Sequence, residues 1–263
     1  MSEHILPPIY VGALPPKYPG IIKMGDSGGH VKLLQEFLSL EGYNLQLDGD
    51  FGPATREAVK SFNHKVLGLP EPHLFEATWS ALTNKVKRSL QCLSFPNNTS
   101  IYNKAVAYAE RHLVCGAREL GGENLGPWVR LYMQGNEGHD YPWCAGFVSF
   151  VLKQVAETVN MAMDPIYTLS CDELGKWADS KGCLYTDLPD VGILGSIFLL
   201  KKASDDPHFD YIHTGFVTSY NDGAIATIEG NTNAAGAREG VGVMRRFRSL
   251  KNIHLITGYL GDM

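Results

Sequence analysis

The spacing of apolar residues changes once along the chain, near residue 188. Before that point apolar side chains recur every three or four residues, as they do on one face of a helix. After it, short runs rich in β-branched and aromatic residues are separated by Gly, Asn and Asp, which is typical of strands joined by tight turns. Helices first and antiparallel strands later predict an α+β fold with the helices packed on one face of the sheet.

The N-terminal third predicts three short helices. Ser27 is the expected N-cap of the first, Gly42 ends it, and Pro53 opens the second. The third carries Trp79, and the three together predict a small helical bundle. Downstream helices are expected over 105–113, 143–156 and 172–179, and strands over 196–200, 211–220, 224–229 and 241–247.

The length of 263 residues allows about two domains, since single domains average ~100–150 residues. The stretch 86–97 is polar and interrupted by proline, which predicts a boundary there. We therefore expect one domain at 1–90, with an extended lead-in at 1–20, and a second domain at 98–263.

Charge and cysteine usage exclude several classes of protein. The net charge is −5, and residues 1–90 contribute nothing to it (9 basic, 9 acidic), which disfavours binding to nucleic acid or an anionic membrane surface through a basic face. No apolar run approaches the ~20 residues of a membrane-spanning helix. The cysteines are odd in number and form no CxxC pair, so neither a disulfide scaffold nor a zinc site is expected. These cysteines are Cys92, Cys115, Cys144, Cys171 and Cys183.

Cys144 is distinguished from the other cysteines by its position. It follows Pro142 and Trp143 in the first turn of a predicted helix. Unpaired N–H groups and the positive end of the helix dipole favour a thiolate there, which makes the sulfur a usable nucleophile. The alternative is a small buried core residue, which is the role we expect for the other four cysteines.

A cysteine nucleophile requires a general base oriented by a third group. His213 lies in the middle of the predicted strand 211–220 and shares a face with Gly215, where a substrate could approach, whereas Ile212 and Phe216 are expected in the core. With a three-residue loop at 221–223, His213 is opposite Asn231 and diagonal to Glu229. A slip of one residue would turn both partners to the other face, so the assignment depends on the loop.

Two resemblances bear on function. The first covers residues ~20–85, which resemble the peptidoglycan-binding module of the PG-binding-1 type. The matching positions include Gly25-Asp26-Ser27-Gly28, Leu34-Gln35, Asp48-Gly49-Asp50-Phe51-Gly52, Ala58-Val59, Phe62 and Thr78-Trp79. Asn63 departs from the Gln usual in the family. Most of these residues are expected in the core, and calcium at Asp48 and Asp50 is not expected.

The second resemblance covers residues ~100–260. The segment Tyr141–Ser149 looks like the nucleophile segment of CHAP domains, the cysteine- and histidine-dependent amidohydrolases and peptidases. His213–Val217 is similar to their His-x-Gly strand, and Ile228–Thr232 to their Glu-Gly-Asn strand end. Ser196 stands where an Asp is common, and the Asp-rich calcium loop of some members is absent, so we expect no metal and no other cofactor.

The resemblance to CHAP domains implies a papain-like α+β domain and assigns roles. Cys144 is the nucleophile, His213 is its base, and Glu229 orients the imidazole. Asn231 is carried over as a second polar partner that helps to stabilise the oxyanion. Together with the wall-binding module, this implies a peptidoglycan hydrolase that cuts an amide bond, either as an N-acetylmuramoyl-L-alanine amidase or as a peptide endopeptidase, and most simply as a monomer.

Alternatives remain open from the sequence. One is a catalytically silent wall-binding protein with Cys144 in the core, and another is a cytosolic thiol amidase acting on a small metabolite. No Sec signal peptide is visible, so we expect synthesis in the cytoplasm and delivery to the cell wall or periplasm by other means. The enzyme would be a phage endolysin or, as the negative charge slightly favours, an injected effector with a cognate immunity protein.

Overall fold

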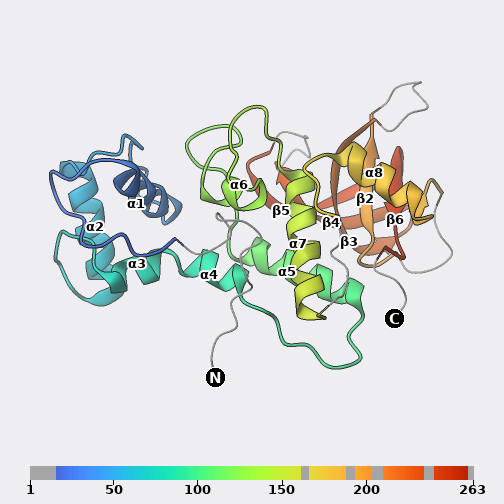
Figure 1. The fold of residues 1–263 in the computed structure, drawn as a ribbon, viewed down its shortest axis with the longest axis horizontal. Coiled ribbons are helices and arrows are strands. Elements are labelled where there is room, and N and C mark those ends of the chain that lie inside the picture. Colours follow the sequence, from blue (N-terminus) through green and yellow to red (C-terminus); the bar gives the residue numbers. More distant parts are fainter. Residues whose placement is uncertain (1–15, 161–165, 188–192, 203–209, 234–239, 260–263) are drawn as a thin grey trace.

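A computed structural model of the chain describes residues 16–160, 166–187, 193–202, 210–233 and 240–259. Eight helices and a six-stranded sheet are defined in these ranges, and every paired strand is antiparallel. This confirms the mixed α+β class. Helices α1 to α3 lie at one end of the molecule and the sheet at the other, with α5 to α7 between them (Figure 1).

The helices follow the expected sites with two additions, α4 and α6. Pro127 opens α6 as the first helical residue, and α4 follows α3 after Thr83 alone, within the region where a domain boundary is expected. The helices are α1 (Gly29–Leu40), α2 (Pro53–Leu67), α3 (Glu76–Leu82), α4 (Asn84–Leu90), α5 (Ile101–Val114), α6 (Pro127–Tyr132), α7 (Cys144–Thr158) and α8 (Cys171–Ser180).

The sheet has the order β1-β6-β2-β3-β4-β5. Helix α7 packs against β3 and β4, and α8 packs against β3. The opposite face carries a smaller apolar cluster around Phe198, Val217 and Ile225. The strands are β1 (Leu184–Tyr185), β2 (Ile197–Lys201), β3 (Tyr211–Asn221), β4 (Ala224–Thr232), β5 (Gly242–Ser249) and β6 (Ile253–Ile256). The short strands β1 and β6 are absent from the sequence-based expectation.

The β3–β4 hairpin differs from the expected one at both its turn and its body. Asn221 pairs with Ala224 across a two-residue turn at Asp222 and Gly223, both with positive φ, so the three-residue loop is wrong. A bulge between Val217 and Ser219 then shifts the register by one residue. Beyond the bulge, Phe216 pairs with Ile228, which is the expected register. The shorter turn and the bulge offset each other, so the side chains near His213 fall on the expected face.

Buried amides hold together the N-terminal helices. Gln35 in α1 donates to the Asp48 carboxylate at 2.7 Å and accepts from the Gly49 N–H at 2.9 Å, which pins the turn before α2. Asn63 in α2 donates to the Glu71 carbonyl at 2.7 Å and accepts from the Thr78 hydroxyl at 2.6 Å. The residue that departs from the family pattern therefore fixes the segment that leads into α3.

The first helix begins one residue later than expected. Gly28, not Ser27, is the N-cap of α1, and Ser27 instead forms an isolated bridge with Asp50. Gly42 does follow the helix with a φ of 98°, a conformation that favours glycine. The small shift ties the start of α1 to the turn that Gln35 holds.

The N-terminal helices are joined to the rest of the chain by specific polar contacts. Arg130 in α6 forms a bidentate pair with Glu36 of α1, at 2.6 and 3.2 Å, and also bonds Glu137 at 2.7 Å. Arg118 donates to the Leu40 carbonyl at 2.8 Å. One cluster of buried apolar side chains runs from α1 to the sheet. The boundary at 90–97 stays a prediction, since packing is continuous across it.

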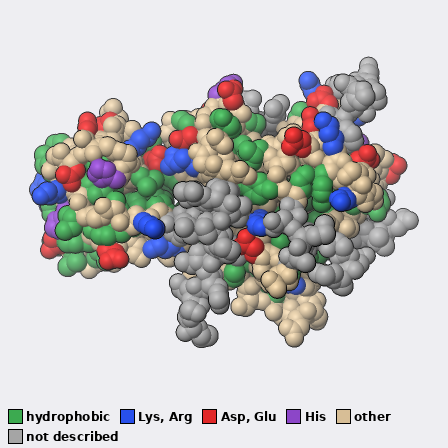
Figure 2. Space-filling view, viewed as in Figure 1, with side chains coloured by type: hydrophobic (Ala, Val, Ile, Leu, Met, Phe, Trp, Pro, Cys, Tyr) green, Lys and Arg blue, Asp and Glu red, His purple; other side chains and the backbone are tan. Residues whose placement is uncertain are grey.

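The surface seen in Figure 2 shows acidic and basic side chains interspersed over the N-terminal helices, in keeping with their balanced charge. No helix in the described part of the chain has both the length and the apolar character needed to cross a membrane.

Candidate active site

Cys144 is the first residue of α7 and is 4% exposed. Its backbone lies at the end of the helix where N–H groups have no partner within the helix, and the Ala145 N–H interacts with its sulfur. The thiol opens onto a cavity of about 470 Å³. The cavity walls include Asp140, Tyr141, Leu169, Cys171, Glu173 and Ile212. Cys144, the predicted nucleophile, is therefore buried, but it lines a cavity large enough for a ligand.

His213 lies on β3 and is fully buried, not on an open face as expected. Its Nε2 bonds Glu229 Oε2 on β4 at 2.8 Å. Glu229 occupies Nε2, and the buried Nδ1 makes no hydrogen bond with any described residue. Cys144 and His213 are close enough that each shifts the pKa of the other. Ile212, expected in the core, is instead half-buried and lines the cavity.

Gly215 makes room for the carboxylate that His213 contacts. A Cβ atom at this position would lie 2.9 Å from Glu229 Cγ and 2.7 Å from the Ile228 carbonyl. Any larger residue would push Glu229 away from the imidazole. Gly230 is also a close approach, because a Cβ there would lie 2.7 Å from Phe147 of α7. These glycines allow the two strands and the helix to approach closely.

Glu229 is held by more than the histidine. Arg248 on β5 forms a bidentate pair with it, with both N···O distances at 2.5 Å. The Thr227 hydroxyl donates to Oε1 at 2.6 Å. The guanidinium also lies 5.3 Å from the centre of the Phe198 ring. A charged, hydrogen-bonded chain therefore runs from the histidine through the carboxylate to Arg248.

The three ionisable groups shift one another's protonation. Burial opposes charge on Glu229, but hydrogen bonds from Arg248 and His213 outweigh it and lower its pKa to about 2. Burial likewise opposes charge on His213, but its contacts with Cys144 and Glu229 raise its pKa to about 9. The pKa of Cys144 is lowered well below its usual value by the Cys171 thiol, and by His213 against the effect of burial. These directions favour a thiolate–imidazolium pair at neutral pH.

Asn231 contacts the segment before the cysteine. It lies at a bulge between β4 and β5 with a φ of 52°. With its amide oriented to satisfy both ends, the oxygen accepts from the Trp143 N–H at 3.3 Å and the nitrogen donates to the Gly240 carbonyl at 2.9 Å and to Glu119 at 3.2 Å. Glu119 also accepts from the Trp143 indole at 2.9 Å. Asn231 thus fixes the residue that precedes Cys144.

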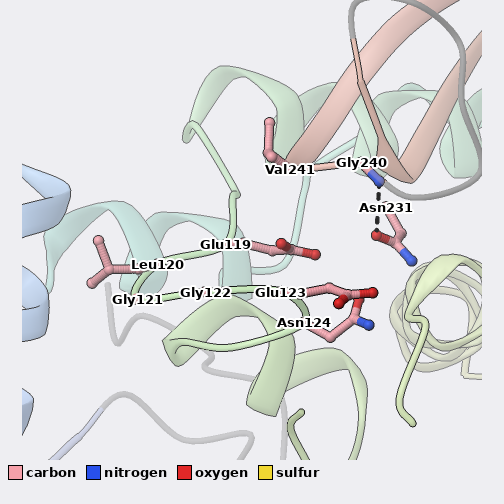
Figure 3. A pocket seen from close by; sticks show the side chains of 9 residues that line it. All are labelled: Glu119, Leu120, Gly121, Gly122, Glu123, Asn124, Asn231, Gly240 and Val241. Atoms are coloured by element: carbon pink, nitrogen blue, oxygen red, sulfur yellow. Dashed lines mark hydrogen bonds between the residues drawn. The ribbon is translucent and has the colours of Figure 1, made fainter. Parts of the chain in front are cut away.

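A second cavity of about 420 Å³ lies on the Asn231 side of Trp143. Figure 3 shows the side chains of Glu119, Glu123 and Asn124 extending in the same direction, toward the side where the Asn231 amide lies. Burial raises the pKa of Glu119. The lining of this cavity carries two carboxylates and does not include Cys144.

Three residues at the site escaped the sequence analysis. Arg248 and Thr227 hold Glu229, and Cys171 places its sulfur 3.7 Å from that of Cys144. Two further histidines, His139 and His208, lie in polar loops of the sequence, where they are expected to be solvated. His139 is exposed and bonds Glu123 at 2.9 Å. His208 lies outside the described residues.

The geometry suits nucleophilic attack by a thiolate. Cys144, predicted as the nucleophile, lies at a helix N-terminus, and His213, predicted as its base, is hydrogen-bonded to Glu229. Among the described residues, no three His, Cys, Asp or Glu side chains converge as metal ligands do.

Comparison with known families adds one finding. Residues 27–71 match the family named Putative peptidoglycan binding domain. The chain carries a peptidoglycan-binding domain. This domain covers α1 and α2, including the turn pinned by Gln35. Neither the curated proteins nor the solved structures contain a match to the chain.

Proposed function

We propose that the protein is a peptidoglycan amidohydrolase that uses Cys144 as nucleophile, His213 as general base and acid, and Glu229 to orient the imidazole. The observation that carries the proposal is the buried chain of hydrogen bonds from His213 through Glu229 to Arg248, with the Cys144 thiol close enough to His213 that each shifts the pKa of the other. A structural cysteine has no need of such a chain, because a neutral thiol packs as a small apolar group.

The reaction begins with attack by the Cys144 thiolate on an amide carbonyl carbon. Negative charge develops on the carbonyl oxygen, where N–H groups at the start of α7 can stabilise it. The His213 imidazolium then gives its proton to the leaving amine. Neutral His213 takes a proton from water, which attacks the thioester and releases the acyl product. Glu229 stays ionised throughout and stabilises the imidazolium.

The peptidoglycan-binding domain supports murein as the substrate. Contacts through Arg130 and Arg118 join this domain to the part of the chain that carries Cys144. Attachment to the polymer raises the local concentration of amide bonds at the thiol. The helix-on-sheet arrangement of α7 with β3 and β4 is in keeping with a papain-like CHAP domain, for which the bond is a lactyl–L-alanine amide or a peptide bond of the stem.

The test compares full-length wild-type protein with Cys144→Ala on purified sacculi. We expect the variant to lose at least ~10³-fold in the rate at which new amines are released, because no other group replaces the nucleophile. Mass spectrometry of the soluble muropeptides identifies the bond. Cys183→Ala, a buried cysteine away from the site, serves as the matched control and retains activity.

Co-sedimentation with sacculi separates the enzyme from a silent wall-binding protein. Both variants are expected to sediment with murein as the wild type does, because α1 and α2 are unchanged. If the wild type sediments but releases no amines, the protein binds the wall without cutting it. Equal lysis by Cys144→Ala would show that the nucleophile is wrongly assigned.

A further inference from the structure

Two cysteines meet at the start of two helices. Cys144 is the first residue of α7 and Cys171 the first residue of α8, and their sulfur atoms are 3.7 Å apart. Ser170 caps α8 through the Glu173 N–H, which fixes where that helix begins. The segments are separated by 27 positions in the sequence, so only the fold brings the thiols together.

The surroundings of the Cys144 sulfur favour the reactive thiolate, and Cys171 is the thiol beside it. The positive end of a helix dipole faces each of them. The pKa of Cys144 is lowered well below its usual value, with the Cys171 thiol as the largest cause. Both residues line the cavity of about 470 Å³, so a small oxidant can reach them although they are 4% and 8% exposed.

We propose that Cys144 and Cys171 form a reversible redox pair, in which a peroxide oxidises Cys144 and Cys171 resolves the product as a disulfide. The regulatory meaning of this pair rests on the proposed function, since Cys144 is the nucleophile there. Formation of the disulfide itself does not depend on the proposed function. The sulfur atoms need to approach by less than 2 Å, from 3.7 Å to the ~2.05 Å of an S–S bond.

The chemistry balances with hydrogen peroxide as the oxidant. The Cys144 thiolate attacks one peroxide oxygen, an S–O bond forms, the O–O bond breaks, and the departing hydroxide takes the proton from His213 to give water. The Cys171 thiolate then attacks the sulfenic sulfur. The S–S bond forms, the S–O bond breaks, and the second hydroxide leaves as water with the Cys171 proton. Two thiols and one peroxide yield one disulfide and two waters.

The pair has a protective consequence for the nucleophile. A sulfenic acid without a nearby thiol is oxidised further to sulfinic acid, which ordinary thiols do not reduce. A disulfide stops this progression and returns to two thiols with a reductant. The site is thus switched off under peroxide and recovers afterwards.

The test uses the full-length protein treated with a small molar excess of hydrogen peroxide. Remaining thiols are then alkylated, and digested peptides are analysed by mass spectrometry. We expect a cross-linked peptide joining residues 144 and 171, and both thiols lost together. Amine release from sacculi falls by at least ~tenfold and returns with dithiothreitol.

Two variants sharpen the test. Cys171→Ser retains size but cannot resolve the sulfenic acid, so we expect Cys144 to reach the sulfinic state and activity, relative to the same untreated variant, not to return. Cys183→Ser is the matched control and still forms the cross-link. Because the wild-type cross-link is measured directly, the result does not depend on whether the Cys171 variant folds.

The outcomes separate the two proposals. Sulfinic acid at Cys144 of the wild type, with Cys171 still open to alkylation, overturns the redox pair whether or not murein is cut. A cross-link in a protein that never releases amines supports the redox pair and removes the hydrolase. Loss of activity in peroxide without the cross-link also counts against the pair.

Discussion

Two buried histidines in this protein have opposite protonation. His112, in the helical core, and His213, in the sheet, are both 0% exposed. His112 bonds the Gln154 amide and the Tyr132 hydroxyl, each at 2.9 Å, and burial among neutral groups lowers its pKa to about 4. The pKa of His213 is raised to about 9, because its contacts with Cys144 and Glu229 outweigh burial. The charge of the partner, not the degree of burial, separates a structural histidine from a reactive one.

The difference in pKa between the two histidines should disappear when the charged partner of His213 is made neutral. Glu229→Gln gives His213 an amide like that of His112. Its pKa then falls, the thiolate–imidazolium pair is lost at neutral pH, and we expect amine release from sacculi to drop by ~10²–10⁴-fold. An NMR titration of the imidazoles reports the pKa change directly.

Gln154→Glu is the reciprocal control. It gives His112 a carboxylate, so the pKa of His112 should rise while the folded enzyme keeps its activity. The Gln154 amide N–H that donates to the Ser89 carbonyl is lost, which should lower the free energy of unfolding by ~1–3 kcal/mol. If Glu229→Gln kept both the raised histidine pKa and the activity, the contrast would rest on something other than partner charge.

Removing the cation behind Glu229 should have the next largest effect. Arg248→Met leaves the buried carboxylate with only His213 and Thr227, and we expect the free energy of unfolding to fall by ~2–4 kcal/mol in urea denaturation. Glu229 contributes stability above its ordinary pKa of ~4.3, and this is lost as the pH falls through about 2. The variant lacks part of this stabilisation, so its free energy of unfolding should fall less steeply over that pH range.

The neighbouring pair of Arg245 and Glu110 provides the matched control for Arg248. It is largely exposed, so Arg245→Met should cost less than ~1 kcal/mol. Equal losses in the two variants would mean that burial of Glu229 adds nothing to the strength of its pairing.

The smallest expected effect is on the pH dependence of the free energy of unfolding. His112 has a lowered pKa, so its neutral form stabilises the fold above the unfolded value of ~6.5, and this contribution is lost as the pH falls through about 4. His112→Gln should therefore flatten the decline of unfolding free energy between these values. In the proposed mechanism, murein cleavage requires protonated His213, so its rate should fall as the pH rises through about 9. A His112 variant that shifted this alkaline limit would contradict the separation of the two sites.

The fold class and the candidate site residues that lie in consecutive motifs are open to prediction from sequence. Periodicity locates α7 and β3, and Cys144, His213 and Glu229 belong to segments with recognisable local patterns. His112 also had a signal, because it shares a helix face with the buried residues Ala105, Tyr108 and Ala109. A histidine on an apolar helix face is most simply a core residue.

The remaining parts of the site depend on long-range packing. The β4–β5 register places Arg248 opposite Ile225 and Glu229 opposite Met244. The pairing of Arg248 with Glu229 therefore depends on the reach of its side chain past the Phe198 ring. Cys171 begins a short helix and reaches Cys144 only through the placement of α8. No local spacing records these contacts, since the partners are brought together by the sheet and the helices that cover it.

The bulge in β3 separates two demands that a hairpin usually couples. Turn geometry is set at Asp222 and Gly223, whereas the alignment of His213 with Glu229 is set on the far side of the bulge. A residue gained or lost at the tip, with a compensating change at the bulge, would leave His213 and Glu229 aligned. The hairpin tip can therefore be altered independently of the candidate site.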